Sequence, residues 1–212
     1  MPHLTIALLG PPRVEQDGAP IEVDTRKAIA LLAYLAVGEA AGASRGSLAA
    51  LFWPEVDQAR AHAALRRTLS ALHKAVDGET LRIEREGVSL PRTGDVWCDV
   101  TEFLARLAAG RAHGHPAQAV CDQCLAPLAE AAALYRDDFM AGFTLRDSPG
   151  FDDWQFFQTE ALRRALAGAL ERLVAGHSRR GEWDTAGAYA RRWLALDPLH
   201  EPAHRRLMEL YA

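Results

Sequence analysis

Cysteine is scarce in this sequence of 212 residues, and no long apolar run is present. Three cysteines are too few for a disulfide framework, which favours a reducing compartment. No apolar run reaches the length of a membrane span. The N-terminus lacks both the positive leader and the small-residue cleavage site of a signal peptide. We therefore expect a cytoplasmic protein that does not enter a membrane.

Catalytic signatures are also missing. The sequence has no nucleophile elbow, no His-Glu-x-x-His motif, no dinucleotide-binding fingerprint and no glycine-rich phosphate loop. The paired carboxylates Asp137-Asp138 and Asp152-Asp153 adjoin expected helix ends, where acidic side chains cap helices and stabilise their N-termini. We interpret them as structural, so the sequence predicts neither an enzyme nor a cofactor.

A strong positive charge is absent as well, since the formal net charge is −4. This balance argues against a chain that binds nucleic acid with its whole surface. It leaves room for a local basic face, because salt screens each charge beyond about 10 Å. Apolar residues make up 49% and charged residues 25% of the chain, as in a globular protein that buries a core.

One local basic face is found between Asp57 and Gly78. Leucines and a valine recur there at spacings of four, three and four, which predicts an amphipathic α-helix. The apolar positions are Leu65, Leu69, Leu72 and Val76. Basic residues lie off this stripe, so the helix is either an ordinary solvated surface helix or one that enters a DNA major groove.

The neighbouring segments favour the second interpretation. A short helix that begins at Ser44 or Ser47 and ends at Trp53-Pro54 precedes the basic helix, which is the order of a helix-turn-helix. A hairpin around Glu86-Gly87 follows it, in the position of a wing. Arg82, Arg85 and Arg92 are the cations of this wing.

The N-terminal part predicts a small antiparallel sheet and one further helix. His3 to Leu9 is a strand pattern, and Asp17-Gly18 is a hairpin turn signal between residues 13–15 and 21–23. Thr25 is a predicted N-cap for a helix that ends near Val37. Arg26 and Lys27 in its first turn are either a solvated pair or contacts to phosphate or an acidic partner.

Beyond residue 94 the pattern is almost purely helical, and we predict a domain boundary between residues 94 and 95. Residues 181–198 match the second half of a tetratricopeptide repeat, and another repeat helix begins near Ala203. That last helix has no partner in the sequence, so we expect an incomplete array. The predicted fold class is mainly α with a small β component.

His113, His115, Cys121 and Cys124 form the only metal-like cluster of the sequence. Four nitrogen and sulfur ligands can close a tetrahedral zinc site. The histidine spacing is atypical, so we favour a pair of reduced thiols without metal over a zinc site.

Several segments together resemble the SARP-type bacterial regulators, which have an OmpR-like winged helix followed by a bacterial transcriptional activator domain. In the first part the matching segments are LLGPPRV (8–14), TRKAIALLAYLA (25–36), SRGSLAALFWP (44–54) and LRRTLSALHKAV (65–76). In the second part they are CDVTEF (98–103), AAALYRDDFMAGF (131–143) and RRWLALDPLHEPAHRRLMELY (191–211). The resemblance implies a winged helix-turn-helix over residues 1–94 and a tetratricopeptide-like helical domain over residues 95–212.

The resemblance also implies a function. Regulators of this type read direct repeats in promoter DNA with the recognition helix, and their helical domain contributes to dimerisation and to contact with RNA polymerase. Carried over by position, the DNA-binding candidates are Arg60, His62, Arg66, Arg67, Ser70, Lys74 and Arg85. This sequence departs from the family at Ala71 and His73, where arginine is frequent. The alternative is a protein-interaction scaffold whose winged helix does not bind DNA tightly.

Overall fold

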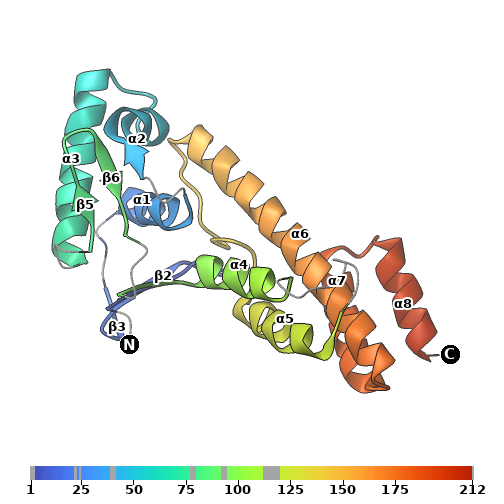
Figure 1. Ribbon diagram of the computed structural model, residues 1–212. Coiled ribbons are helices and arrows are strands. Elements are labelled where there is room, and N and C mark those ends of the chain that lie inside the picture. The colour runs from blue at the N-terminus through green and yellow to red at the C-terminus, as the bar shows by residue number, and fades with distance from the viewer. Residues whose placement is uncertain are drawn as a thin grey trace. The chain divides into compact units, whose positions relative to one another are not determined.

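The structure is a computed structural model that describes residues 3–21, 23, 25–38, 42–76, 80–91, 95–111 and 120–211 (Figure 1). The chain packs into two compact units. Unit 1 comprises residues 1–101 and 137–158, and unit 2 comprises residues 102–136 and 159–212. The predicted domain boundary between residues 94 and 95 stays a prediction, because compact units report packing and not the limits of domains.

The first sheet of unit 1 has the strand order β3-β2-β1-β7. β1 (Leu4–Ala7), β2 (Arg13–Gln16) and β3 (Ala19–Pro20) form the expected antiparallel meander. The turn residues Asp17 and Gly18 have φ angles of 52° and 80°, as a two-residue hairpin loop requires. β7 (Val96–Cys98), which the sequence pattern does not predict, pairs in parallel with β1.

Each of the first helices of unit 1 begins at a side-chain cap. Thr25 accepts a hydrogen bond from the backbone N–H of Ala28 and starts α1 (Arg26–Val37). Ser44 accepts one from Ser47 and starts α2 (Arg45–Phe52), which ends at Trp53. Asp57 accepts one from Arg60 and starts α3 (Gln58–Ala75). Such caps satisfy N–H groups that the first helical turn leaves without partners, and the predicted helix starts are confirmed.

A second sheet of unit 1 contains the hairpin predicted after α3. Its strand order is β4 (Ala43–Ser44), β6 (Gly87–Ser89), β5 (Arg82–Ile83), all antiparallel. Gly42, which precedes β4, has a φ of 82°, and a Cβ atom there would lie 2.6 Å from the carbonyl oxygen of Val88. Only glycine therefore lets the chain approach β6 this closely.

Residues 137–148, here named the connector, belong to unit 1 although residues 102–136, which precede them, belong to unit 2. The backbone N–H of Met140 donates to Leu8, and that of Gly10 donates to Asp138. Phe139 and the start of α6 (Pro149–Arg179) then enter an aromatic cluster with α1 and α2. Two ring pairs of this cluster, Tyr34–Trp154 at 4.9 Å and Phe52–Phe151 at 5.4 Å, join side chains more than 90 residues apart. The connector therefore completes the core of unit 1.

Unit 2 is helical, as predicted. It contains most of α4 (Asp99–Ala109) and α6, together with α5 (Asp122–Leu134), α7 (Trp183–Leu196) and α8 (Glu201–Tyr211). Alanines at matched repeat positions, Ala186, Ala190 and Ala203, are fully buried and let the helices approach closely. None of the helices in the described part of the chain has the length and apolar character of a membrane span.

Arg192 joins two helices of unit 2. Its Nη2 donates to the backbone carbonyls of Ala132 and Tyr135 at the end of α5, at 2.7 and 2.5 Å. The last turn of a helix directs its carbonyls to partners outside the helix, so the cation both caps this end of α5 and complements the negative end of the dipole. Burial lowers the pKa of Arg192.

Asp99 is a buried carboxylate that ties the end of β1 to the start of α4. It is 1% exposed, and its two oxygens accept hydrogen bonds from the backbone N–H groups of Leu8 at 2.8 Å and Leu9 at 2.9 Å. A buried charge is tolerated only where such donors replace water. Asp99, the second residue of the matched segment CDVTEF, thus has a structural role.

We predict that Asp99→Ala lowers the free energy of unfolding by about 3 kcal/mol, because two buried N–H groups lose a charged acceptor. Urea unfolding followed by circular dichroism measures the change. The control is Asp95→Ala, which removes an exposed carboxylate nearby and should change stability by less than about 0.5 kcal/mol. Equal unfolding midpoints for the two variants would contradict the assigned role.

Candidate nucleic-acid interface

The helix α3 has one buried and one exposed side. Its buried residues are Ala61, Leu65, Leu69 and Leu72, and Val76 directly after the helix is buried too. These residues recur at spacings of four, four, three and four, so they follow one stripe of the helix. The stripe packs on α2 and α1 and fixes which residues of α3 point outward.

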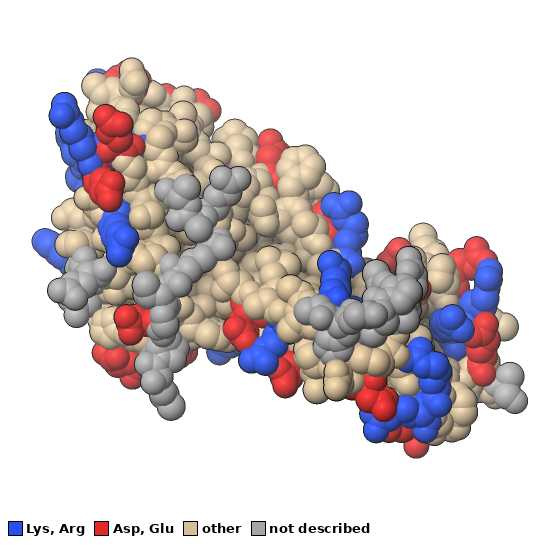
Figure 2. All heavy atoms as spheres, viewed as in Figure 1, with Lys and Arg blue, Asp and Glu red and all other residues tan. Residues whose placement is uncertain are grey.

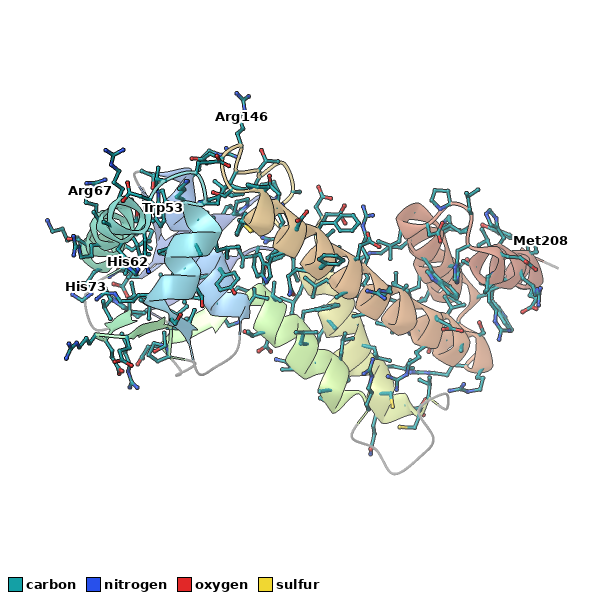
Figure 3. The ribbon with its side chains drawn as sticks, turned by 90° about the horizontal axis from the view of Figure 1, so that it is seen from above. Trp53, His62, Arg67, His73, Arg146 and Met208 are labelled. Carbon is teal, nitrogen blue, oxygen red and sulfur yellow. The ribbon has the colours of Figure 1, made fainter. Side chains whose placement is uncertain are left out.

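Four of the predicted DNA-binding residues share the outward side. At about 100° of rotation per residue, Arg60, Arg67, Ser70 and Lys74 lie within roughly 80° of one another, opposite the buried stripe. All four are exposed, and Arg67 projects away from the body of unit 1 (Figure 3). Arg60 also forms an ion pair with the cap residue Asp57, with 3.2 Å between Nε and Oδ2. The structure thus brings Arg67, Ser70 and Lys74 together on one face, with Arg60 at its first turn.

The other two candidates on α3 lie on a flank of this face. Arg66 is exposed and His62 is half-buried. One helical turn relates them, and His73 continues the same row. His73 is exposed, whereas Ala71 is half-buried, so the two departures from the family pattern occupy different environments.

The wing contributes a mixed charge. Arg85 is exposed in the turn between β5 and β6, with exposed Glu84 and Glu86 beside it. The turn is closed by a hydrogen bond from the N–H of Glu84 to the carbonyl of Gly87. Blue and red side chains lie intermixed on the face of this region shown in Figure 2. The predicted wing cation Arg92 lies outside the described residues.

Lys27 holds the segment that leads into α3. Its side chain is 15% exposed, and its Nζ donates to the carbonyl of Phe52 and lies 2.8 Å from Oδ2 of Asp147. The same Nζ lies 5.0 Å from the ring centroid of Trp53. Ser148 is fully buried and donates to the same Phe52 carbonyl at 2.9 Å. The end of α2 is thereby attached to both α1 and the connector.

Arg26 contacts the connector in a similar way. Its guanidinium donates from Nε and Nη2 to the carbonyl of Thr144 and lies 4.4 Å from the ring centroid of Phe143. The sequence allowed two interpretations of Arg26 and Lys27, a solvated pair or contacts to phosphate or an acidic partner. In the structure both cations bind groups of the same chain, and the acidic partner of Lys27 is Asp147.

The metal-like cluster is only partly described. Cys121 and Cys124 have their sulfur atoms 3.5 Å apart, whereas His113 and His115 lie outside the described residues. Among the residues that the structure describes, no group of three or more histidine, cysteine or carboxylate side chains could hold a metal ion.

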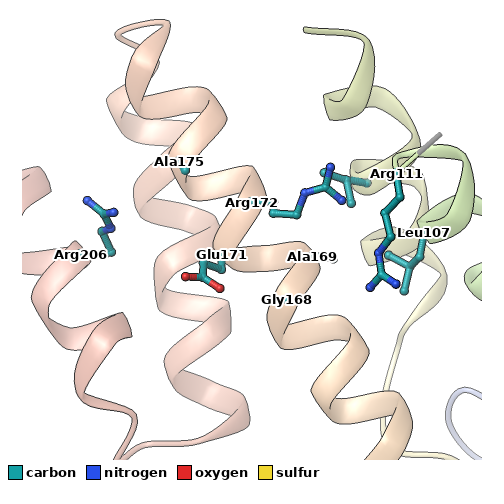
Figure 4. A pocket seen from close by; sticks show the side chains of 9 residues that line it. Leu107, Arg111, Gly168, Ala169, Glu171, Arg172, Ala175 and Arg206 are labelled. Atoms are coloured by element: carbon teal, nitrogen blue, oxygen red, sulfur yellow. The ribbon is translucent and has the colours of Figure 1, made fainter. Parts of the chain in front are cut away.

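Unit 2 contains a pocket of about 490 Å³, far in sequence from α3 (Figure 4). Its charged lining is Arg111, Glu171, Arg172 and Arg206, and its apolar lining includes Leu107 and Leu128. Arg172 donates from Nη2 to the carbonyl of Gly110 at the end of α4, and Arg206 forms an ion pair with Glu209. Both arginines therefore already bind groups of the same unit.

Two comparisons with known proteins find a match, one to the second part of the chain and one to the fold of the whole chain. Residues 98–212 match the family described as the bacterial transcriptional activator domain. The fold of the whole chain is similar to that of EmbR from Mycobacterium tuberculosis, solved in complex with a low-affinity phosphopeptide, with a TM-score of 0.75 and 24% identity. That alignment covers 100% of this chain and 55% of the EmbR chain. A search of curated proteins finds no match.

The fold similarity confirms the predicted fold class, mainly α with a small β component, and the order of winged helix and helical repeats. It does not test the individual DNA-binding candidates, which stay predictions.

We predict that Lys27→Met lowers the free energy of unfolding by about 2 kcal/mol, because the Phe52 carbonyl loses a charged donor. It should also speed amide hydrogen exchange in residues 53–58, which follow that carbonyl. Urea unfolding and exchange mass spectrometry measure the two effects. Lys74→Met removes an exposed charge on α3 and is the matched control; the same loss of stability in both variants would refute the role of Lys27.

Proposed function

The chain belongs to the bacterial transcriptional activator domain family, and we propose that it regulates transcription by binding promoter DNA through α3. This membership confirms the resemblance to SARP-type regulators and places the chain among transcriptional activators. The direct contact with DNA, the residues that make it and the partner proteins are the further steps of the proposal.

The observation that carries the proposal is the exposed face of α3. A helix that enters the major groove has one face anchored in the protein, and basic side chains on its other face favour contact with phosphates and guanine edges. Arg67, Ser70 and Lys74 form such a face, and α3 itself contains no aspartate or glutamate. Arginine and lysine can reach guanine edges or phosphates, and serine can bind either kind of group.

The net charge of −4 restricts where this contact can occur. Screening limits the repulsion from distant carboxylates to about 10 Å at moderate salt. Glu84 and Glu86 in the wing are near enough in sequence to Arg85 to weaken a phosphate contact there. We therefore assign most of the affinity to α3 and expect the wing to add little.

For the helical part we infer contacts with RNA polymerase and with a second copy of the chain. Support for self-association comes from α8, where Met208 is 73% and Tyr211 71% exposed. The two side chains are three residues apart and so neighbours on the helix surface, and a contiguous exposed apolar patch favours a partner surface. The alternative function is a protein-interaction scaffold. The same exposed residues of α8 support it, as does the exposed pair Phe156–Phe157.

We predict that Arg67→Ala weakens binding to the chain's own promoter fragment about 5-fold to 150-fold, the loss of one base contact of about 1–3 kcal/mol. Lys74→Ala should reduce the slope of log affinity against log salt by about 0.9, the value for one phosphate contact. Fluorescence anisotropy across a salt series measures both quantities.

Arg205→Ala is the control for these variants. It removes the same charge from α8, where Arg205 is paired with Glu201, and should leave affinity and slope unchanged. If Arg67→Ala and Lys74→Ala both bind as the unchanged chain does, the assignment of α3 fails. If no genomic fragment binds at all, the scaffold function is favoured.

We further predict that the chain sediments as a dimer, at about twice its mass of 23.2 kDa, and that Met208→Glu shifts it to the monomer because a charge at an apolar contact must be desolvated. Analytical ultracentrifugation over a concentration series measures the change, with Lys74→Ala on α3 as the variant that should stay dimeric. A monomeric unchanged chain at every concentration would rule out this surface.

A further inference from the structure

The first turn of α5 carries two cysteines whose sulfur atoms almost meet. Cys121 is the N-cap residue of α5, and Cys124 lies three residues later in the first turn. Their Sγ atoms are 3.5 Å apart, compared with about 2.0 Å for a disulfide bond. The backbone N–H of Cys124 donates to the carbonyl of Cys121, so the two residues close a turn. Residues related by such a turn have Cα atoms less than about 7 Å apart, as a disulfide requires.

Packing holds this turn in place. Cys124 is fully buried. Arg179 near the end of α6 donates to the carbonyl of Val120, the residue before Cys121. Gly176 on α6 allows the closest approach, because a Cβ atom there would lie 2.4 Å from a methyl carbon of Leu125. The thiol pair is thus part of a fixed α5–α6 contact within unit 2.

The two thiols differ in access. Cys121 is half-buried and Cys124 is buried. An external reagent therefore reaches Cys121 first, and Cys124 is the nearest thiol for a second step. An accessible cysteine next to a resolving cysteine is the arrangement that redox-sensitive sites use.

We propose that Cys121 and Cys124 are a redox site that forms a reversible intramolecular disulfide with small-molecule disulfides as the oxidant. This site is independent of DNA binding by α3, and neither proposal requires the other.

The reaction consists of two exchange steps. The Cys121 thiolate, formed by loss of its proton to solvent, attacks one sulfur of the disulfide RS–SR and releases one RS⁻. The Cys124 thiolate, formed in the same way, then attacks Sγ of Cys121 in the mixed disulfide and releases the second RS⁻. The two released thiolates take up the two protons, so two cysteine thiols are oxidised and one external disulfide is reduced to two thiols.

The third cysteine is an internal control. Cys98 lies in β7 and is 4% exposed. Burial raises the pKa of the Cys98 thiol to about 11, so at pH 8 only about one molecule in a thousand carries the reactive thiolate. We expect Cys98 to stay reduced under conditions that oxidise the pair.

The test equilibrates the full chain with mixtures of reduced and oxidised glutathione at pH 8, quenches with acid and maps the thiols by alkylation and mass spectrometry. We expect one Cys121–Cys124 disulfide, reversed by dithiothreitol, with Cys98 reduced. The equilibrium constant should be at least about tenfold larger for the folded chain than for the chain in concentrated urea, because the folded turn has already lost the entropy of loop closure.

Two variants separate the roles of the thiols. Cys124→Ser should accumulate a glutathione adduct at Cys121, whereas Cys121→Ser should remain without an adduct at the buried Cys124. Equal constants in the folded and unfolded chain, a stable glutathione adduct in the unchanged chain, or a disulfide between two chains would overturn the proposal. So would zinc in stoichiometric amount in the purified reduced protein.

Discussion

The packing of the connector against the helix-turn-helix is the constraint on which unit 1 depends. Residues 137–148 supply the backbone hydrogen bonds to Leu8 and Gly10, and Ser148 shares the Phe52 carbonyl with Lys27. The rings at the start of α6 fill the space between α1 and α2. Removing the connector would expose apolar area whose burial stabilises the folded state by several kcal/mol, roughly. The segment of unit 1 before the connector, residues 1–101, is therefore not a self-sufficient core.

This constraint also determines how α3 is presented. The connector and Lys27 fix the end of α2, Asp57 caps α3 four residues beyond Trp53, and the buried leucine stripe sets the rotation of the helix. Each of these contacts further restricts the orientation of the exposed face of α3. Arg67, Ser70 and Lys74 consequently share one direction because of contacts made elsewhere, and long side chains on such a rigid support lose less entropy when they bind.

The sequence predicts the local features of this fold well, since caps, turn residues and apolar periodicity are local signals. Thr25, Ser44 and Asp17-Gly18 behave as their chemistry demands. The pairing of β7 with β1 and the insertion of the connector into unit 1 could not be predicted in this way, because both join segments about 90 or more residues apart in sequence. Arg26 and Lys27 illustrate the limit: their charges fitted a solvated pair and contacts to an anion equally well, and only the fold reveals Asp147 and Thr144 as partners.

The same distinction applies to the candidate interface. Periodicity separates the buried stripe of α3 from its basic side, but it does not say which cations are already bound. Lys27 is engaged in unit 1 and Arg60 is paired with Asp57, so the cations of this region are not equivalent. A cation that must first break an ion pair gains less binding free energy from a phosphate contact than a solvated cation does. Arg67 and Lys74, on the exposed face of a helix without carboxylates, thus have the strongest physical case for contact with DNA.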